Sequence, residues 1–257
     1  MRTIIFILIL SLHFNVFLLG QENSVLSSNK WYKVSVTNTG VHKLSYNDFQ
    51  NLNIALNDID INSIKLFGNG GGMLPNLNSQ FRYNDLQENA IYVYDFNNNG
   101  YFNSNDYILF YAESPNKWSY SESIDLFEYK EHLFSDECYY FITIDPDSNG
   151  KRILNKPLLT DYTKVIKSFN DFKVHESNIE NLIQSGREWY GERFGIIDNY
   201  IFDFSFPNLI NSEPIYIKTS VAARSLNSSY FTVNANSNFI SNINIPNIVY
   251  DYATEYA

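Results

Sequence analysis

The sequence has few cysteines and few basic residues, and each shortage excludes a class of protein. Cys138 is the only cysteine, which excludes a small domain held together by disulfides. The 18 Lys and Arg residues are outnumbered by 28 Asp and Glu residues, for a net charge of −10. So acidic a chain is a poor candidate for binding nucleic acid or an anionic membrane surface, because both attract basic patches. The sequence therefore predicts no nucleic-acid partner and favours cations or basic partners.

Side chains that could carry out catalysis are also scarce. Beyond residue 20 the histidines are His42, His132 and His175, and no second histidine follows His175-Glu176 at the spacing of a zinc peptidase. Cys138 alternates with apolar residues in a strand-like segment, which favours a small buried side chain over the nucleophile of a Cys–His pair. We therefore predict no catalytic residues in this chain and surface or capping roles for its histidines.

Aromatic residues, by contrast, are abundant. The chain contains 20 Tyr, 20 Phe and 3 Trp, and 44% of its residues are hydrophobic. Disordered chains are poor in aromatic residues, so this composition predicts a folded protein. A length of 257 residues allows one large domain or two small ones.

Residues 1–20 have the pattern of a secretory signal peptide. The apolar run at 4–12 is too short for a membrane span of about 20 residues, and His13 and Asn15 separate it from a second apolar patch at 16–19. Gly20 is a small residue suited to the cleavage site. The leader predicts an exported chain; the alternative is an N-terminal anchor helix.

Strand-like patterning dominates the mature chain. Asn38-Thr39-Gly40 is a turn signal that predicts a hairpin between the strands on either side of it. The segments at 90–94 and 107–112 are expected to pair around a polar loop. Strands are expected at 31–36, 41–44, 64–67, 90–94, 107–112, 138–144, 166–172, 200–206, 215–222, 230–234 and 239–245.

Helical signals are few. Ser45 and Asp48 form an N-capping box for a short helix, and 179–183 is expected to form a helical turn. The regular spacing of strands after residue 200 is typical of a β-sandwich. The predicted fold class is mostly β: an α+β first domain at 29–195, then the start of a β-sandwich at 196–257.

The sharpest chemical signal is a twelve-residue loop that begins at Asp95. Its oxygen-bearing side chains and its glycine have the spacing of an EF-hand calcium loop. The last position is Asp106 in place of the usual glutamate, and the flanking segments are strands. The alternative is an Asn- and Gly-rich hairpin loop without a metal. The predicted Ca²⁺ ligands are Asp95, Asn97, Asn99, Tyr101, Asn103 and Asp106.

A second loop, at 68–72, contains four glycines after a strand. It lacks the Gly-Lys-Ser/Thr ending of a phosphate loop, and Pro75 argues against an immediate helix. We interpret it as a tight loop whose glycines permit positive φ angles.

Several segments together resemble the N-terminal, non-catalytic region of the PorU family, the sortases of the type IX secretion system. The resemblance covers residues 29–250, and its most specific segment is Ser185-Gly186-Arg187-Glu188-Trp189-Tyr190-Gly191-Glu192. The other matching segments lie at 31–34, 39–44, 64–71, 106–111 and 221–225.

The resemblance implies a partial sortase. Members of the family carry a gingipain-type cysteine peptidase domain after this region, process the C-terminal sorting signals of exported cargo and attach the cargo to the cell surface beside the outer-membrane protein PorV. No catalytic residue can be transferred, because the peptidase domain is absent from these 257 residues. The expected partners are therefore a peptidase domain, PorV and other attachment components, at the outer membrane.

The segment at 185–192 is the predicted interaction or interdomain cluster. Its members are Arg187, Glu188, Trp189 and Glu192, and we expect it at the domain junction with Trp189 mostly buried. If Trp189 instead contacts a partner, its loss should weaken docking and leave stability intact. A different class of function, a cell-surface glycan-binding or adhesion module, remains the alternative, and exposed aromatic residues would favour it.

Overall fold

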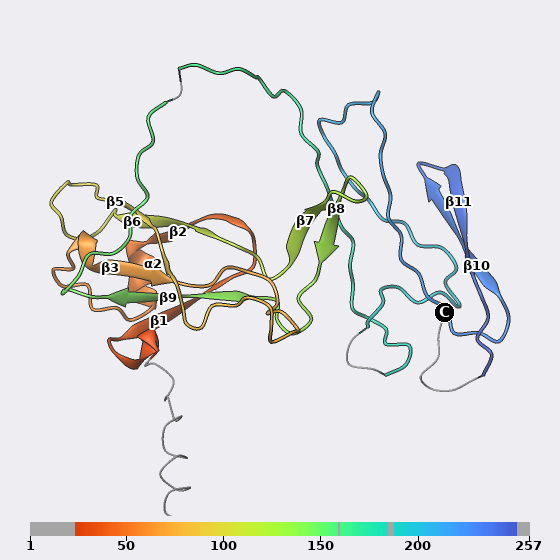
Figure 1. Ribbon diagram of the computed structural model, residues 1–257, viewed down its shortest axis with the longest axis horizontal. Helices are drawn as coiled ribbons and strands as arrows, with labels where there is room; N and C mark the ends of the chain where they lie inside the picture. Colours follow the sequence, from red (N-terminus) through yellow and green to blue (C-terminus); the bar gives the residue numbers. More distant parts are fainter. Residues whose placement is uncertain (1–23, 159, 185–187, 251–257) are drawn as a thin grey trace, which may run out of the picture. The chain divides into compact units, whose positions relative to one another are not determined.

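The computed structural model describes residues 24–158, 160–184 and 188–250 (Figure 1). The predicted signal peptide lies outside these ranges. The structure is 29% strand and 5% helix, and its sheets are antiparallel, so the predicted mostly β fold class is confirmed. No helix in the described ranges is both long and apolar enough to cross a membrane.

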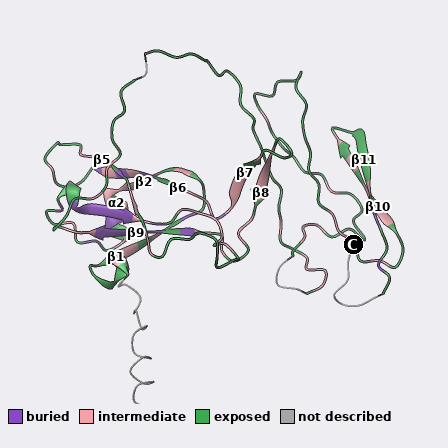
Figure 2. Ribbon diagram, in the orientation of Figure 1, coloured by how far each residue is buried: buried purple, intermediate pink, exposed green. Residues whose placement is uncertain are grey.

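The chain divides into two compact units, Met1–Thr160 and Asp161–Ala257. This division comes earlier than the boundary expected near residue 195. Buried residues gather in the strands of the first unit, whereas the second unit is mostly exposed (Figure 2).

Sheet A of the first unit has four strands in the order β1-β9-β3-β4. The central strand β9 directs Cys138, Tyr140 and Ile142 into the core, so the predicted burial of the cysteine is confirmed. The bounds of the four strands are Trp31–Val36, Cys138–Ile144, Ile64–Phe67 and Glu88–Asn89.

Sheet B has three strands in the order β2-β6-β5, with bounds Gly40–Ser45, Tyr107–Ala112 and Tyr92–Tyr94. Ile108 and Phe110 on β6 are at most 1% exposed. The ring of Phe110 lies 5.6 Å from the ring of Tyr140 on sheet A. The main hydrophobic core therefore contains residues from both sheets.

The predicted hairpin between the first two strands is wrong in its pairing. β1 pairs along its whole length with β9, and β2 pairs along its whole length with β6. The short link after Val36 carries the chain from sheet A to sheet B. The local turn signal was correct, but each strand pairs at six positions with a strand far along the chain. The predicted pairing of 90–94 with 107–112 is confirmed as β5 and β6.

The single α-helix of the described residues, α2 (Tyr46–Asn51), begins at the predicted capping box. The Asp48 amide donates to the hydroxyl of Ser45, and the Ser45 amide donates to the carboxylate of Asp48 at 2.7 Å. Phe49 is fully buried, and its ring lies 4.6 Å from that of Phe102. Short 3₁₀ helices occur at η1 (Val25–Ser27) and η2 (Ile61–Ser63).

A separate hairpin, β7 (Lys117–Ser121) and β8 (Leu126–Lys130), was not predicted. Its strands pair Trp118 with Tyr129 and Tyr120 with Phe127, so aromatic rings face one another across the hairpin.

The second unit contains one hairpin in its described part, β10 (Ser229–Ala235) and β11 (Asn238–Ile245), which confirms the last two predicted strands. The strands predicted at 166–172, 200–206 and 215–222 are wrong, because no ladder forms there. The predicted helical turn at 179–183 is also wrong: Glu180 forms an antiparallel bridge with Tyr190.

Candidate functional site

The loop Asp95–Asp106 connects β5 to β6 and is closed by its own hydrogen bonds. Asp95 accepts amide hydrogen bonds from Asn99 at 3.3 Å and Gly100 at 2.8 Å. Asp106 is 1% exposed and accepts the amides of Phe96 at 2.8 Å and Asn103 at 2.7 Å. Both carboxylates therefore hold the backbone in a wrapped conformation.

The amide side chains of the loop donate hydrogen bonds to one another. The Asn97 side chain donates to that of Asn103 at 3.2 Å, and the Asn103 side chain donates to that of Asn99 at 3.2 Å. Asn103 also donates to the carbonyl of Tyr101 at 3.0 Å. The Asn99 oxygen also accepts the Tyr101 amide at 2.9 Å, whereas the oxygens of Asn103 and Tyr101 each accept one of these bonds and keep a second lone pair, which suits a hard cation. Among the described residues, however, no three His, Cys, Asp or Glu side chains gather as a metal site. Calcium binding therefore stays a prediction.

We expect millimolar Ca²⁺ to raise the melting temperature, because a bound cation offsets repulsion between Asp95 and Asp106 and stabilises only the folded loop. Asp95→Ala should abolish this calcium-dependent rise. Asp147→Ala, which removes an exposed carboxylate from another turn, should leave the rise unchanged. If about 10 mM Ca²⁺, above the millimolar affinity of weak calcium sites, does not change the melting temperature of the wild type, the loop is a hydrogen-bonded hairpin without a calcium site.

Of the predicted interaction cluster, Glu188, Trp189 and Glu192 are described, and Arg187 lies outside the described residues. Trp189 is 45% exposed, so the prediction that it is mostly buried is wrong. The segment lies within the second unit and not at the division between the units. In the described part of this segment, the only β-bridge joins Tyr190 to Glu180. Trp189, the residue before Tyr190, stays at the surface.

Glu192 is held by His175, whose Nε2 lies 2.8 Å from its carboxylate. Burial alone would raise the pKa of Glu192, but the hydrogen bond from His175 and an amide hydrogen bond outweigh it and lower this pKa. The ring of His175 also lies 4.3 Å from that of Phe202. No pattern in the sequence indicated this pair.

The glycine-rich loop after β3 surrounds the carboxylate of Glu113. The Gly71 amide donates to Glu113 Oε2 at 3.0 Å, and Lys117 Nζ lies 2.5 Å from the same atom. Burial alone would raise the pKa of Glu113, but these two donors outweigh it and lower the pKa. A loop amide that could bind a phosphate is thus used by the protein's own carboxylate. Gly72 has the positive φ that we predicted, 83°.

Within the described ranges, each histidine and the cysteine has a structural contact. His42 Nε2 lies 2.8 Å from the Asn38 carbonyl, and His132 Nδ1 accepts the amides of Phe134 and Ser135. Burial raises the pKa of the Cys138 thiol, which an amide hydrogen bond from Gly72 only partly opposes. A protonated, buried thiol is a poor nucleophile.

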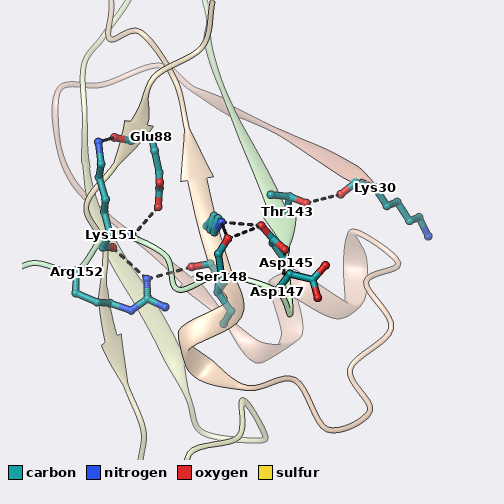
Figure 3. Close-up of polar contacts among 10 residues, drawn as sticks. Lys30, Glu88, Thr143, Asp145, Asp147, Ser148, Lys151 and Arg152 are labelled. Atoms are coloured by element: carbon teal, nitrogen blue, oxygen red, sulfur yellow. Dashed lines mark hydrogen bonds and ion pairs between the residues drawn. The ribbon is translucent and has the colours of Figure 1, made fainter. Parts of the chain in front are cut away.

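One charged cluster was not predicted from the sequence. Lys65 lies in a strand of otherwise apolar residues, is 9% exposed, and donates to Asp145 at 2.7 Å and to Ser148 at 2.5 Å. Figure 3 shows the two acceptors in the turn after β9. The hydrogen bonds from Lys65 and then Ser148 lower the pKa of Asp145. Through these contacts, Lys65 attaches β3 to the turn that follows β9.

Beside it, the guanidinium of Arg152 donates to three carbonyls, those of Ile61 at 2.5 Å, Ile64 at 3.1 Å and Lys151 at 3.1 Å. Figure 3 shows Arg152 beside Lys151. The Lys151 amide donates to Glu88 at 2.6 Å. These contacts attach the chain after β9 to η2 and β4. They are spread over the backbone and form no open site.

The fold and the sites together define a mostly β module with antiparallel sheets. No protein-family model matches the sequence, and no curated protein matches it significantly. The fold is similar to that of dimeric latent PorU from Porphyromonas gingivalis, with a TM-score of 0.50 and 20% sequence identity. The similarity covers 82% of this chain and 15% of the PorU chain. The chain therefore has a PorU-like fold and spans a small part of the length of that protein.

Proposed function

We propose that this chain is the non-catalytic N-terminal part of a type IX secretion sortase resembling PorU, exported and held at the outer-membrane surface. The observation that supports the proposal is the PorU-like fold over 82% of the chain. Its role is that of a scaffold that docks a peptidase domain and an outer-membrane protein of the PorV kind. The peptidase would process the sorting signals of cargo and attach the cargo to the surface.

The segment around Trp189 supports a docking role. The exposed indole lies next to the Glu180–Tyr190 bridge, and the His175–Glu192 pair holds the chain three residues after the tryptophan. An aromatic side chain presented on a fixed backbone loses little conformational entropy when a partner covers it, and tryptophan is enriched at the energetic centres of interfaces.

The direct test measures binding of the tagged chain to the peptidase region and to the PorV-type protein from the same genome. Trp189→Ala should change the free energy of unfolding by less than about 0.5 kcal/mol, since the side chain is exposed. It should weaken docking to one of these partners about tenfold or more, as expected for a truncated interface anchor. Tyr216→Ala, another exposed aromatic residue of the second unit, serves as the matched control.

Two results would contradict two different parts of the proposal, the scaffold function and the docking role of Trp189. Failure of the wild-type chain to bind either partner would remove the scaffold function itself. Normal docking by Trp189→Ala would leave that function standing and move the contact elsewhere on the chain.

A further inference from the structure

Sheet B has a second side that the core does not use. Residues of β6 alternate: Ile108, Phe110 and Ala112 are buried, whereas the residues between them face outward. The outward residues of β2 and β5 lie in register with them. We name this side the tyrosine face, and its members are Val41, Lys43, Ser45, Tyr92, Tyr94, Tyr107, Leu109 and Tyr111.

The rings of the tyrosine face are ordered by one another. Tyr94 and Tyr107 are cross-strand partners whose rings stack with centroids 4.7 Å apart and an interplanar angle of 18°. The ammonium of Lys43 lies 4.2 Å from the centroid of Tyr107. Tyr92 is 40% exposed and Tyr111 is 55% exposed. Two rings thus remain accessible beside a fixed pair.

The charge of the face differs from that of the chain. Lys43 is its one ionised side chain, while the whole chain carries −10. Nucleic acid needs several basic contacts to the backbone phosphates, and a membrane-binding face needs a basic or strongly apolar surface. Neither condition is met by four tyrosines, a leucine, a valine, a serine and a single lysine.

The size of the face argues against a protein partner. β6 has six residues, or about 20 Å of strand, and three strands span about 10 Å. The resulting area, about 200 Å², is well below the roughly 800 Å² that each partner contributes to a stable protein interface. It does match a ligand that is narrow and extended.

We propose that the tyrosine face binds a polysaccharide chain. A pyranose ring presents C–H groups on its faces and hydroxyls at its rim. A tyrosine presents a π face to the former and a phenolic hydroxyl to the latter. Tyr92 faces Leu109, and Tyr111 lies two residues further along β6, so the two accessible rings are diagonal neighbours about 7–8 Å apart at the backbone. Successive sugars of one chain stack on these two rings.

Lys43 adds a preference that the test can resolve. Its ammonium lies at the face beside Tyr107 and is available to a carboxylate or phosphate group on a sugar. A neutral polysaccharide uses only the rings, whereas an acidic one also uses this charge. Polysaccharide binding at this face does not depend on the proposed sortase function, because it requires only the sheet and its exposed side chains.

The test is affinity electrophoresis of the full chain in native gels containing laminarin, yeast mannan or polygalacturonate. At least one of these polymers should retard the wild type. Tyr92→Ala/Tyr111→Ala should raise the dissociation constant at least tenfold, and Tyr111→Leu, which keeps an apolar side chain, should raise it several-fold. Tyr230→Ala, at a still more exposed tyrosine of β10, should have no effect. Lys43→Gln should weaken binding of polygalacturonate alone.

Three outcomes would overturn the proposal. The first is no retardation by any of the three polymers. The second is equal retardation of the wild type and of a double variant shown by near-ultraviolet circular dichroism to be folded. The third is sedimentation of the wild type as a dimer and of the double variant as a monomer, which would make the face a protein interface.

Discussion

Replacing Phe102 by alanine is expected to lower the free energy of unfolding of the first unit by about 3–5 kcal/mol, the usual loss for a large buried aromatic residue. Phe102 is 1% exposed and lies inside the Asp95–Asp106 loop, where its ring packs 4.6 Å from Phe49 and 6.2 Å from Tyr46. Its amide also donates to the Ile59 carbonyl at 2.8 Å. The side chain therefore anchors the candidate calcium loop to the core.

The neighbouring residue provides a matched control. Tyr101 is 51% exposed, so Tyr101→Ala should change the free energy of unfolding by less than about 0.5 kcal/mol. Denaturant titration of both variants tests the difference. Equal stability for the two variants would mean that the loop does not depend on the core for its conformation.

Gly71→Ala is expected to lower the free energy of unfolding by about 3 kcal/mol, the upper range for overpacking. A Cβ atom at this position would lie 1.9 Å from the Ser114 carbonyl oxygen and 3.0 Å from Glu113 Cβ. The nearest obstacle is backbone, which cannot rotate away as a side chain can. The loop must therefore move, and the Gly71 amide then loses Glu113.

Gly100→Ala separates the steric cost from the conformational one. A Cβ at Gly100 meets no atom within 4 Å, but the residue has a φ of 80°. Its replacement should therefore cost only the left-handed backbone penalty, about 1–2 kcal/mol. A loss at Gly71 no larger than that at Gly100 would contradict the close approach to Ser114.

Local signals were sufficient for most elements of the first unit, although not for all of them. Alternating apolar residues located β1, β6 and β9, and the Ser45 capping box located α2. Strand pairing was less accessible, because the turn signal at Asn38 describes a bend in the chain and says nothing about which strand lies alongside. The hairpin of β7 and β8 was missed even though Trp118 and Tyr120 alternate with polar residues.

In the second unit, local strand signals predicted strands that do not form. The segments at 166–172, 200–206 and 215–222 have strand-like composition, but a strand exists only when another segment supplies its hydrogen bonds. Exposure was equally hard to predict. Trp189 in the interaction cluster was expected to be mostly buried at a domain junction but is exposed. The burial of Lys65 depends on Asp145, eighty residues along the chain.

The separation of β1 and β2 between two sheets has a consequence for folding kinetics. β1 lies next to β9 alone, with Val36 opposite Cys138, so most of the first unit must be synthesised before β1 gains any partner. Pairings this distant raise the contact order, which slows folding because the entropy of loop closure is lost before contacts compensate it. Until then β1 remains an unpaired edge that other chains can join. We therefore expect the nascent first unit to depend on a chaperone until Cys138–Ile144 emerges.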